Sequence, residues 1–238
     1  MRSGSRPDLP STCGMVRVAM RVMPAKGSNI PLTSLVDNAP ITSSSRRSGK
    51  IAAIESARAA IGAAAPEVCV AGAWHEEPAF VAALAERLTY TLRCLPADEP
   101  QAASVLMTAH SLPRRVADQE PDYLGQLRAT AEAVAGAAGL PDGSWTFCWQ
   151  SAGHEPGEWM KPDFADLMPE VAARSERSVV VVPVQFLADH LEILYDVDIG
   201  AREQAERCGL AFHRIESLND DPGLIEALAA VARRTLTP

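Results

Sequence analysis

The sequence has few aromatic side chains, few cysteines and no long apolar run. Aromatic residues make up 5% of the 238 residues and hydrophobic residues 47%, a composition that favours a globular core over a disordered acidic chain. The five cysteines are scattered and include no CxxC pair, which disfavours a zinc ribbon and a secreted disulfide framework and favours the cytoplasm. No window approaches about 18 uninterrupted apolar residues, so no transmembrane segment is expected.

Several short motifs are also missing. The patterns GxxxxGK[ST], GxGxxG, GxSxG and HExxH do not occur, so a phosphate-binding loop, a hydrolase nucleophile elbow and a zinc protease site lack support. The first 50 residues carry a net positive charge, whereas the rest of the chain is net negative. Residues 1–50 hold eight Lys or Arg and two Asp, a net charge of +6, so the remainder carries −14 to reach the total of −8. A body of that charge does not suit nucleic acid as a partner.

From about residue 50 the chain alternates between short apolar runs and longer helical patterns. The predicted strands are residues 68–73, 104–109, 145–150, 178–186 and 211–216. The predicted helices are residues 51–65, 78–95, 123–138, 163–174, 191–208 and 222–235. Continuous apolar strands separated by helices predict an α/β fold with a parallel, Rossmann-like sheet covered on both faces.

Parallel sheets of this kind bind ligands beyond the carboxyl ends of their strands. The segments that directly follow predicted strands are therefore where chemistry is expected. Three of them carry polar and ionisable side chains, namely residues 109–113 (AHSLP), 150–154 (QSAGH) and 188–192 (ADHLE).

Each candidate residue in or near these segments has two interpretations, one functional and one structural. His110 could hold a metal ion or accept a proton near neutral pH, or its ring could merely hydrogen-bond the following turn. Glu192 could act as a carboxylate in a cleft, or Asp189 and Glu192 could form a capping box at a helix start. Trp149 and Trp159 could contact a flat apolar ligand, or they could be ordinary packing residues.

Taken together, the motifs resemble those of the ferrochelatase family, enzymes that insert ferrous iron into a porphyrin. Residues 108–113 (TAHSLP) resemble the family motif [ST]AHS[LIV]P, residues 149–151 are its WQS, and residues 158–163 (EWMKPD) resemble PWLGPD. Residues 182–192 (VPVQFLADHLE) resemble VPxGFxxDHLE, with Gln185 in place of a glycine. The resemblance is in order and covers roughly residues 66–236.

The resemblance implies a set of site residues. His110 and Glu192 would be the catalytic pair on one face of the porphyrin, and Asp196, four residues after Glu192, would join them as a metal ligand. The residues expected to bind the porphyrin are Ser111, Trp149, Gln150, Ser151, Trp159, Pro162 and His190. Ferrous iron and the porphyrin would be substrates. No organic cofactor and no iron–sulfur cluster are expected.

The resemblance implies a fold with two similar chelatase lobes, of which we expect the first to be N-terminally incomplete. We expect residues 1–37 to be an unrelated or disordered leader, residues 38–102 a partial first lobe, and residues 103–238 a complete second lobe whose final helix packs back on the first. Two other functions stay open, a catalytically impaired remnant that binds tetrapyrrole and a cobalt or nickel chelatase. The sequence decides neither the porphyrin, coproporphyrin III or protoporphyrin IX, nor the oligomeric state.

Overall fold

The structure is a computed structural model that describes residues 44–65, 68–96, 103–153, 156–174 and 176–236, with side chains from residue 51 onward. The predicted leader, residues 1–37, lies outside the described residues. Within the described residues, none of the helices combines the length and the apolar character needed to cross a membrane.

The described chain contains a four-stranded parallel sheet in the order β2-β1-β3-β4, which confirms the predicted fold class. The strands are β1 (Ala103–His110), β2 (Trp145–Gln150), β3 (Ser178–Pro183) and β4 (Ala211–Arg214). Each lies where an apolar run predicts it. The six residues of β3 are all buried, as expected for a strand covered on both faces.

The helices lie between and around these strands. In chain order they are α1 (Ser44–Ile61), the 3₁₀ turn η1 (Gly62–Ala64), α2 (Pro78–Cys94), α3 (Arg114–Ala117), α4 (Pro121–Ala137), α5 (Phe164–Ala173), the π-helix η3 (Glu192–Ala201), α6 (Arg202–Arg207) and α7 (Pro222–Leu236). Local sequence explains several of their ends. Prolines occupy the first turn of α2 and α4, where their missing N–H costs nothing. Gly139 and Gly209 follow α4 and α6 with φ of 68° and 74°, a conformation that favours glycine.

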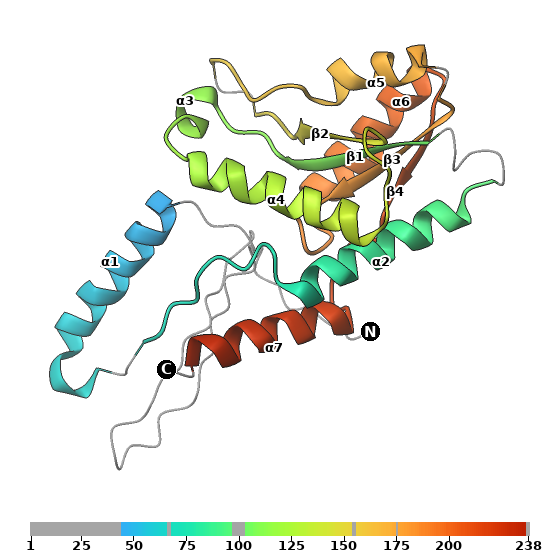
Figure 1. The fold of residues 1–238 in the computed structure, drawn as a ribbon. Coiled ribbons are helices and arrows are strands. Elements are labelled where there is room, and N and C mark those ends of the chain that lie inside the picture. The colour runs from blue at the N-terminus through green and yellow to red at the C-terminus, as the bar shows by residue number, and fades with distance from the viewer. Residues whose placement is uncertain (1–43, 66–67, 97–102, 154–155, 175, 237–238) are drawn as a thin grey trace, which may run out of the picture.

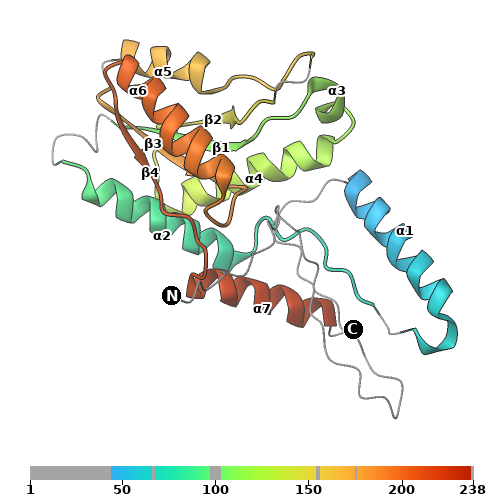
Figure 2. The ribbon, with the colours of Figure 1, turned by 180° about the vertical axis from the view of Figure 1, so that it is seen from behind.

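Helices cover both faces of the sheet (Figures 1 and 2). On one face, side chains of α2 and α4 pack on Val105, Met107, Val180 and Val182. On the other, α5, η3 and α6 pack on inward-facing residues of β1, β2 and β3. The two faces alternate along each strand, as the pleat requires.

The last helix packs on α2 on the side away from the sheet (Figures 1 and 2). Leu224, Ala227 and Val231 of α7 belong to the same buried cluster as the apolar residues of α2. The approach is close at Gly223, where an added Cβ would stand 3.0 Å from the Cβ of Ala83. Residues before the sheet and residues after it therefore share one core.

One predicted strand is wrong. Residues 68–73 contain no regular secondary structure in the described chain. A strand needs a neighbour to satisfy its backbone N–H and C=O groups, and no described strand pairs with this segment. Its apolar character instead reflects packing, since Ala71 lies against the core cluster that includes α2 and α7.

Three other boundaries differ from the sequence pattern. The first helix begins at Ser44 and ends at Ile61, before Gly62, whose φ is 72°. Strand β3 ends at Pro183 rather than residue 186, because proline has no N–H for the ladder and the chain turns beyond it. The predicted helix 191–208 is continuous but changes type, from the π-helix η3 to the α-helix α6.

Candidate functional site

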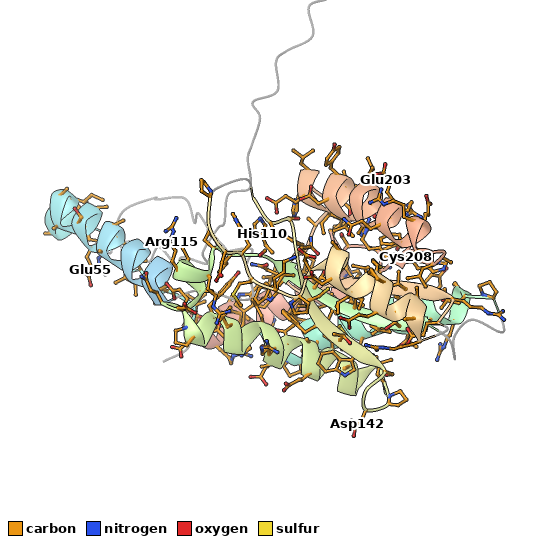
Figure 3. All side chains as sticks on the ribbon, turned by 90° about the horizontal axis from the view of Figure 1, so that it is seen from above. Glu55, His110, Arg115, Asp142, Glu203 and Cys208 are labelled. Carbon is orange, nitrogen blue, oxygen red and sulfur yellow. The ribbon has the colours of Figure 1, made fainter. Side chains whose placement is uncertain are left out.

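The carboxyl ends of β1, β2 and β3 bring the three predicted segments together. His110 is the last residue of β1 and lies opposite Gln150, the last residue of β2. The final pair between β1 and β3 is Thr108 with Pro183, so the segment 188–192 follows at the same end of the sheet. Figure 3 shows His110 between α3, which carries Arg115, and the η3–α6 helix, which carries Glu203.

His110 and Glu192 face one another across this end of the sheet. Their nearest atoms, Nε2 and Oε2, are 3.6 Å apart, and the side chains are 29% and 43% exposed. The other ring nitrogen, Nδ1, lies at hydrogen-bond distance from the carbonyl oxygen of Ser111. A carbonyl oxygen only accepts, so Nδ1 is the donor in this contact, and Nε2 is the ring nitrogen that faces Glu192. His110 therefore contacts the Ser111 carbonyl in the turn and faces the Glu192 carboxylate at the same time.

The capping box considered for Asp189 and Glu192 is not formed. The helix that contains Glu192 starts after Leu191 with no side-chain cap. Asp189 instead accepts hydrogen bonds from Ser217 (2.8 Å) and Asn219 (3.1 Å). The backbone N–H of Glu192 donates to Nδ1 of His190 at 3.3 Å, so the Glu192 carboxylate is free to turn toward His110.

Asp189 belongs to a charged network that anchors the loop before η3. Arg214 lies 3.3 Å from Asp189 and 2.7 Å from Asp198, which is on η3 itself. Partial burial works to raise the pKa of Asp189, but hydrogen bonds from Asn219 and Ser217 and the charge of Arg214 hold that pKa below its ordinary value. The network ties the loop and the helix that carry Glu192 to the end of β4.

The helix that carries Glu192 is π-helical over ten residues. Such segments are rare and usually short, and they occur frequently at functional sites. Asp196 is half-buried on this helix, but the described residues include no cluster of three His, Cys, Asp or Glu side chains suited to a metal ion. Within the described residues, no third side chain of these types joins His110 and Glu192, so the role of Asp196 stays a prediction.

The WQS segment lies largely inside the fold. Trp149 is 1% exposed and packs edge-on against Phe147, with ring centroids 5.2 Å apart. Gln150 is buried and accepts a hydrogen bond from the Thr108 hydroxyl, while Ser151 adopts a left-handed φ of 57°. For Trp149 the structure shows the packing role. Contact of these three residues with a ligand stays a prediction.

Three more of the expected porphyrin contacts lie in the segments that follow β1 and β2. Ser111 is buried, and its hydroxyl donates to the carbonyl of Met160 at 3.3 Å. The half-buried Trp159 has its ring so close to Gly153 that an added Cβ there would stand 2.8 Å from the ring. Pro162 is exposed, and its carbonyl accepts the N–H of Trp149. The hydrogen bond between Trp149 and Pro162 therefore holds the end of this segment against β2.

The sequence analysis assigned no site role to two residues that contact His110, although it noted Gln185. The ring of Phe186 lies between His110 and His190, with centroid distances of 6.3 Å and 4.5 Å. Gln185 accepts a hydrogen bond from the backbone N–H of His110 at 2.8 Å and donates one to the hydroxyl of Tyr123. The signal for Gln185 was present, because the resemblance shows a glycine at this position.

Comparison with known proteins agrees with these observations. A family model described as ferrochelatase matches residues 16–236. Among similar proteins, a ferrochelatase of Herpetosiphon aurantiacus is 39% identical over 69% of this chain and 53% of its own length. A ferrochelatase of Deinococcus radiodurans is 38% identical over 68% of this chain and 51% of its own. A coproporphyrin III ferrochelatase of Geobacillus kaustophilus is 36% identical over 70% and 52%.

The chain spans about half the length of the curated relatives that it matches. The family match nevertheless includes all four strands of the sheet and both residues of the His110–Glu192 pair. The chain therefore belongs to the ferrochelatase family.

Proposed function

We propose that this protein inserts Fe²⁺ into a porphyrin, coproporphyrin III or protoporphyrin IX, in haem biosynthesis. The observation that carries the proposal is the pair formed by His110 Nε2 and Glu192 Oε2, which face one another 3.6 Å apart at the carboxyl ends of the sheet. Both groups are partly exposed, so a substrate can reach them. Family membership supports the same reaction.

The chemistry needs a metal-binding group and a proton acceptor in one place. As Fe²⁺ enters the ring, two pyrrole N–H protons must leave, so the ring exchanges protons for a metal ion without any change of oxidation state. Ferrous iron accepts both imidazole and carboxylate ligands. Two ligand atoms that are each about 2.1 Å from a metal ion stand about 3.0 to 3.4 Å apart, close to the observed separation. Either side chain can therefore present iron while the other accepts protons.

We also propose the expected binding set and cellular setting. Ser111, Trp149, Gln150, Ser151, Trp159, Pro162 and His190 would surround the porphyrin, and Asp196 would assist the metal ion from η3. No organic cofactor or iron–sulfur cluster is required, since proton-for-metal exchange needs neither electrons nor a carried group. The four described cysteines are free thiols, which supports a reducing cytoplasm.

The division of the chain is likewise a proposal. Residues 38–102 would be part of a first lobe and residues 103–238 the second lobe, after the leader 1–37. All four described strands lie after residue 102, and α7 packs on α2, as a helix returning to the first lobe would. These contacts support the division.

The test compares the full-length parent with His110→Ala and Glu192→Gln. Iron insertion is followed by absorbance and porphyrin binding by fluorescence quenching, with coproporphyrin III and protoporphyrin IX in separate assays. Each substitution should lower the insertion rate by about a hundredfold or more, as expected for loss of a proton-transfer or metal-binding group, while porphyrin binding changes little.

The matched control is Glu170→Gln, an exposed carboxylate on α5 that pairs with Arg174 and should not affect insertion. Retained insertion in both site variants would refute the assignment. No insertion of iron by the parent, with intact porphyrin binding, would favour the tetrapyrrole-binding remnant. Insertion of cobalt or nickel alone would favour the other chelatase class.

A further inference from the structure

The backbone of His110 is held beyond the point where the β1–β3 ladder ends. The last paired residues are Thr108 and Pro183, and the N–H of Val184 still donates to the carbonyl of Thr108 at 3.0 Å. Along a parallel strand, alternate residues bond to the same neighbour, so His110 is next in line toward β3. Its backbone N–H meets a side chain instead, the Oε1 atom of Gln185, at 2.8 Å.

The other end of the Gln185 amide is also engaged. Its Nε2 donates to the hydroxyl of Tyr123 on α4. Tyr123 is 8% exposed and packs with Ala109, Leu127 and Trp149. One amide therefore joins the end of β1, the segment after β3 and a helix of the covering layer. Because it uses its acceptor on one side and its donor on the other, its orientation is fixed.

The β2 side of the same turn is fixed as well. The backbone N–H of Ser111 donates to the carbonyl of Gln150 at 2.7 Å. The Ser111 carbonyl in turn accepts a hydrogen bond from Nδ1 of His110, and in this orientation of the ring Nε2 faces Glu192. The direction in which Nε2 of His110 points depends on where the backbone of residues 110 and 111 lies. On the β3 side, Gln185 holds that backbone by accepting the His110 N–H.

We propose that Gln185 is a positioning residue for His110. By replacing the missing ladder bond, it holds the imidazole in the orientation that presents Nε2 to Glu192. Its effect on iron insertion rests on the proposed function, whereas its effect on the imidazole does not. The loss of one such hydrogen bond corresponds to a change of about tenfold in a local equilibrium.

The experiment uses the full chain with three variants. Gln185→Met has a similar length but neither bond, Gln185→Glu keeps an acceptor for the His110 N–H, and Tyr123→Phe removes the hydroxyl at the other end. The control is Gln119→Met, which changes the same residue type at an exposed position. Proton–nitrogen correlation spectra of the His110 ring report its tautomer, and hydrogen exchange reports the protection of the His110 amide.

In Gln185→Met the His110 amide should exchange about tenfold faster, and the ring should lose its single Nδ1–H tautomer. Gln185→Glu should restore amide protection. Tyr123→Phe should give a smaller change in the same direction, and adding it to Gln185→Met should have little further effect, since both act on one amide. The insertion rate at saturating porphyrin should fall about tenfold in Gln185→Met with the KM for porphyrin unchanged.

The spectroscopic and kinetic results separate two kinds of failure. Parent-like ring spectra and amide exchange in Gln185→Met would overturn the proposal whatever the activity. Altered spectra in that variant, in a protein whose parent inserts no iron, would support the positioning role and count against the proposed function only. Altered spectra with an unchanged insertion rate in an active parent would overturn the catalytic part of the inference.

Discussion

Polar side chains near the strand ends contact residues far away in the sequence, in some cases together with a local partner. The His110 ring contacts the carbonyl of the next residue and the carboxylate of Glu192 at the same time. Asp189 forms no local cap and instead contacts Arg214 at the end of β4 and Ser217 and Asn219 just after it. A buried or half-buried polar group takes the partners that satisfy it best, whether or not they are near in sequence.

The network around Asp189 predicts a pH-dependent contribution to stability. Because the folded protein lowers the pKa of Asp189, the ionised group stabilises the fold above its unfolded pKa of about 3.9, and this contribution disappears as the pH falls through the folded pKa. Asp189→Asn should lower the urea midpoint at pH 7, and the difference from the parent should narrow between about pH 5 and pH 3.

The control for this measurement is Asp220→Asn, an exposed carboxylate close by in the β4–α7 connection, which should show little effect at any of these pH values. If the difference in urea midpoint between Asp189→Asn and the parent stayed constant down to about pH 3, the lowered pKa of Asp189 would be contradicted.

Most helices and strands of the described chain lie close to the bounds that the local sequence predicts, but the helix type of η3 was not predicted. The sequence pattern placed β1 to β4 and α2, α4 and α5 close to their observed bounds, because apolar periodicity, proline and glycine act over a few residues. The π-helical winding of η3 was not predicted. A π-turn differs from an α-turn by one residue in its hydrogen bonding, and the sequence period does not distinguish the two over ten residues.

The start of α5 offers a quantitative test of local capping. The Asp163 side chain accepts from the N–H of Asp166 at 3.2 Å, and the Asp166 side chain accepts from the N–H of Asp163 at 2.8 Å. Asp163→Ala removes half of this capping box and should lower the free energy of unfolding by about 1 kcal/mol. Equilibrium unfolding in urea measures the change.

Asp142→Ala, in the exposed turn before β2, is the matched control and should change the free energy of unfolding by less than about 0.5 kcal/mol. Equal losses for the two variants would show that the reciprocal cap does not stabilise α5.

The whole described fold depends on a core that joins segments from before and after the sheet. One continuous cluster contains residues of α2, α4, β1, β3 and α7. The helix proposed as part of a first lobe therefore does not form a core of its own. We expect α2 and the sheet to unfold together.

The substitution Leu88→Ala tests whether α2 and the sheet unfold together. Leu88 is fully buried in α2, so the substitution should cost about 2 to 5 kcal/mol and should shift a single transition seen by both tryptophan fluorescence and circular dichroism. Leu194→Ala removes the same side chain from a position that is 49% exposed and should cost far less. Two separate transitions, with only one shifted, would mean that α2 is independent of the sheet.

The sequence by itself determined the layer architecture and the order of strands and helices along the chain, and the resemblance of its motifs to a known family singled out His110 and Glu192. These depend on period, on turn residues and on motifs that sit next to strand ends, all of which are local. Only the tertiary structure decided that residues 68–73 form no strand, that Trp149 is buried packing, and that Gln185 replaces a ladder bond for His110. Each of those outcomes depends on which residues, far apart in the sequence, lie within contact or hydrogen-bond distance. The pattern of residue types along the chain does not specify such distances.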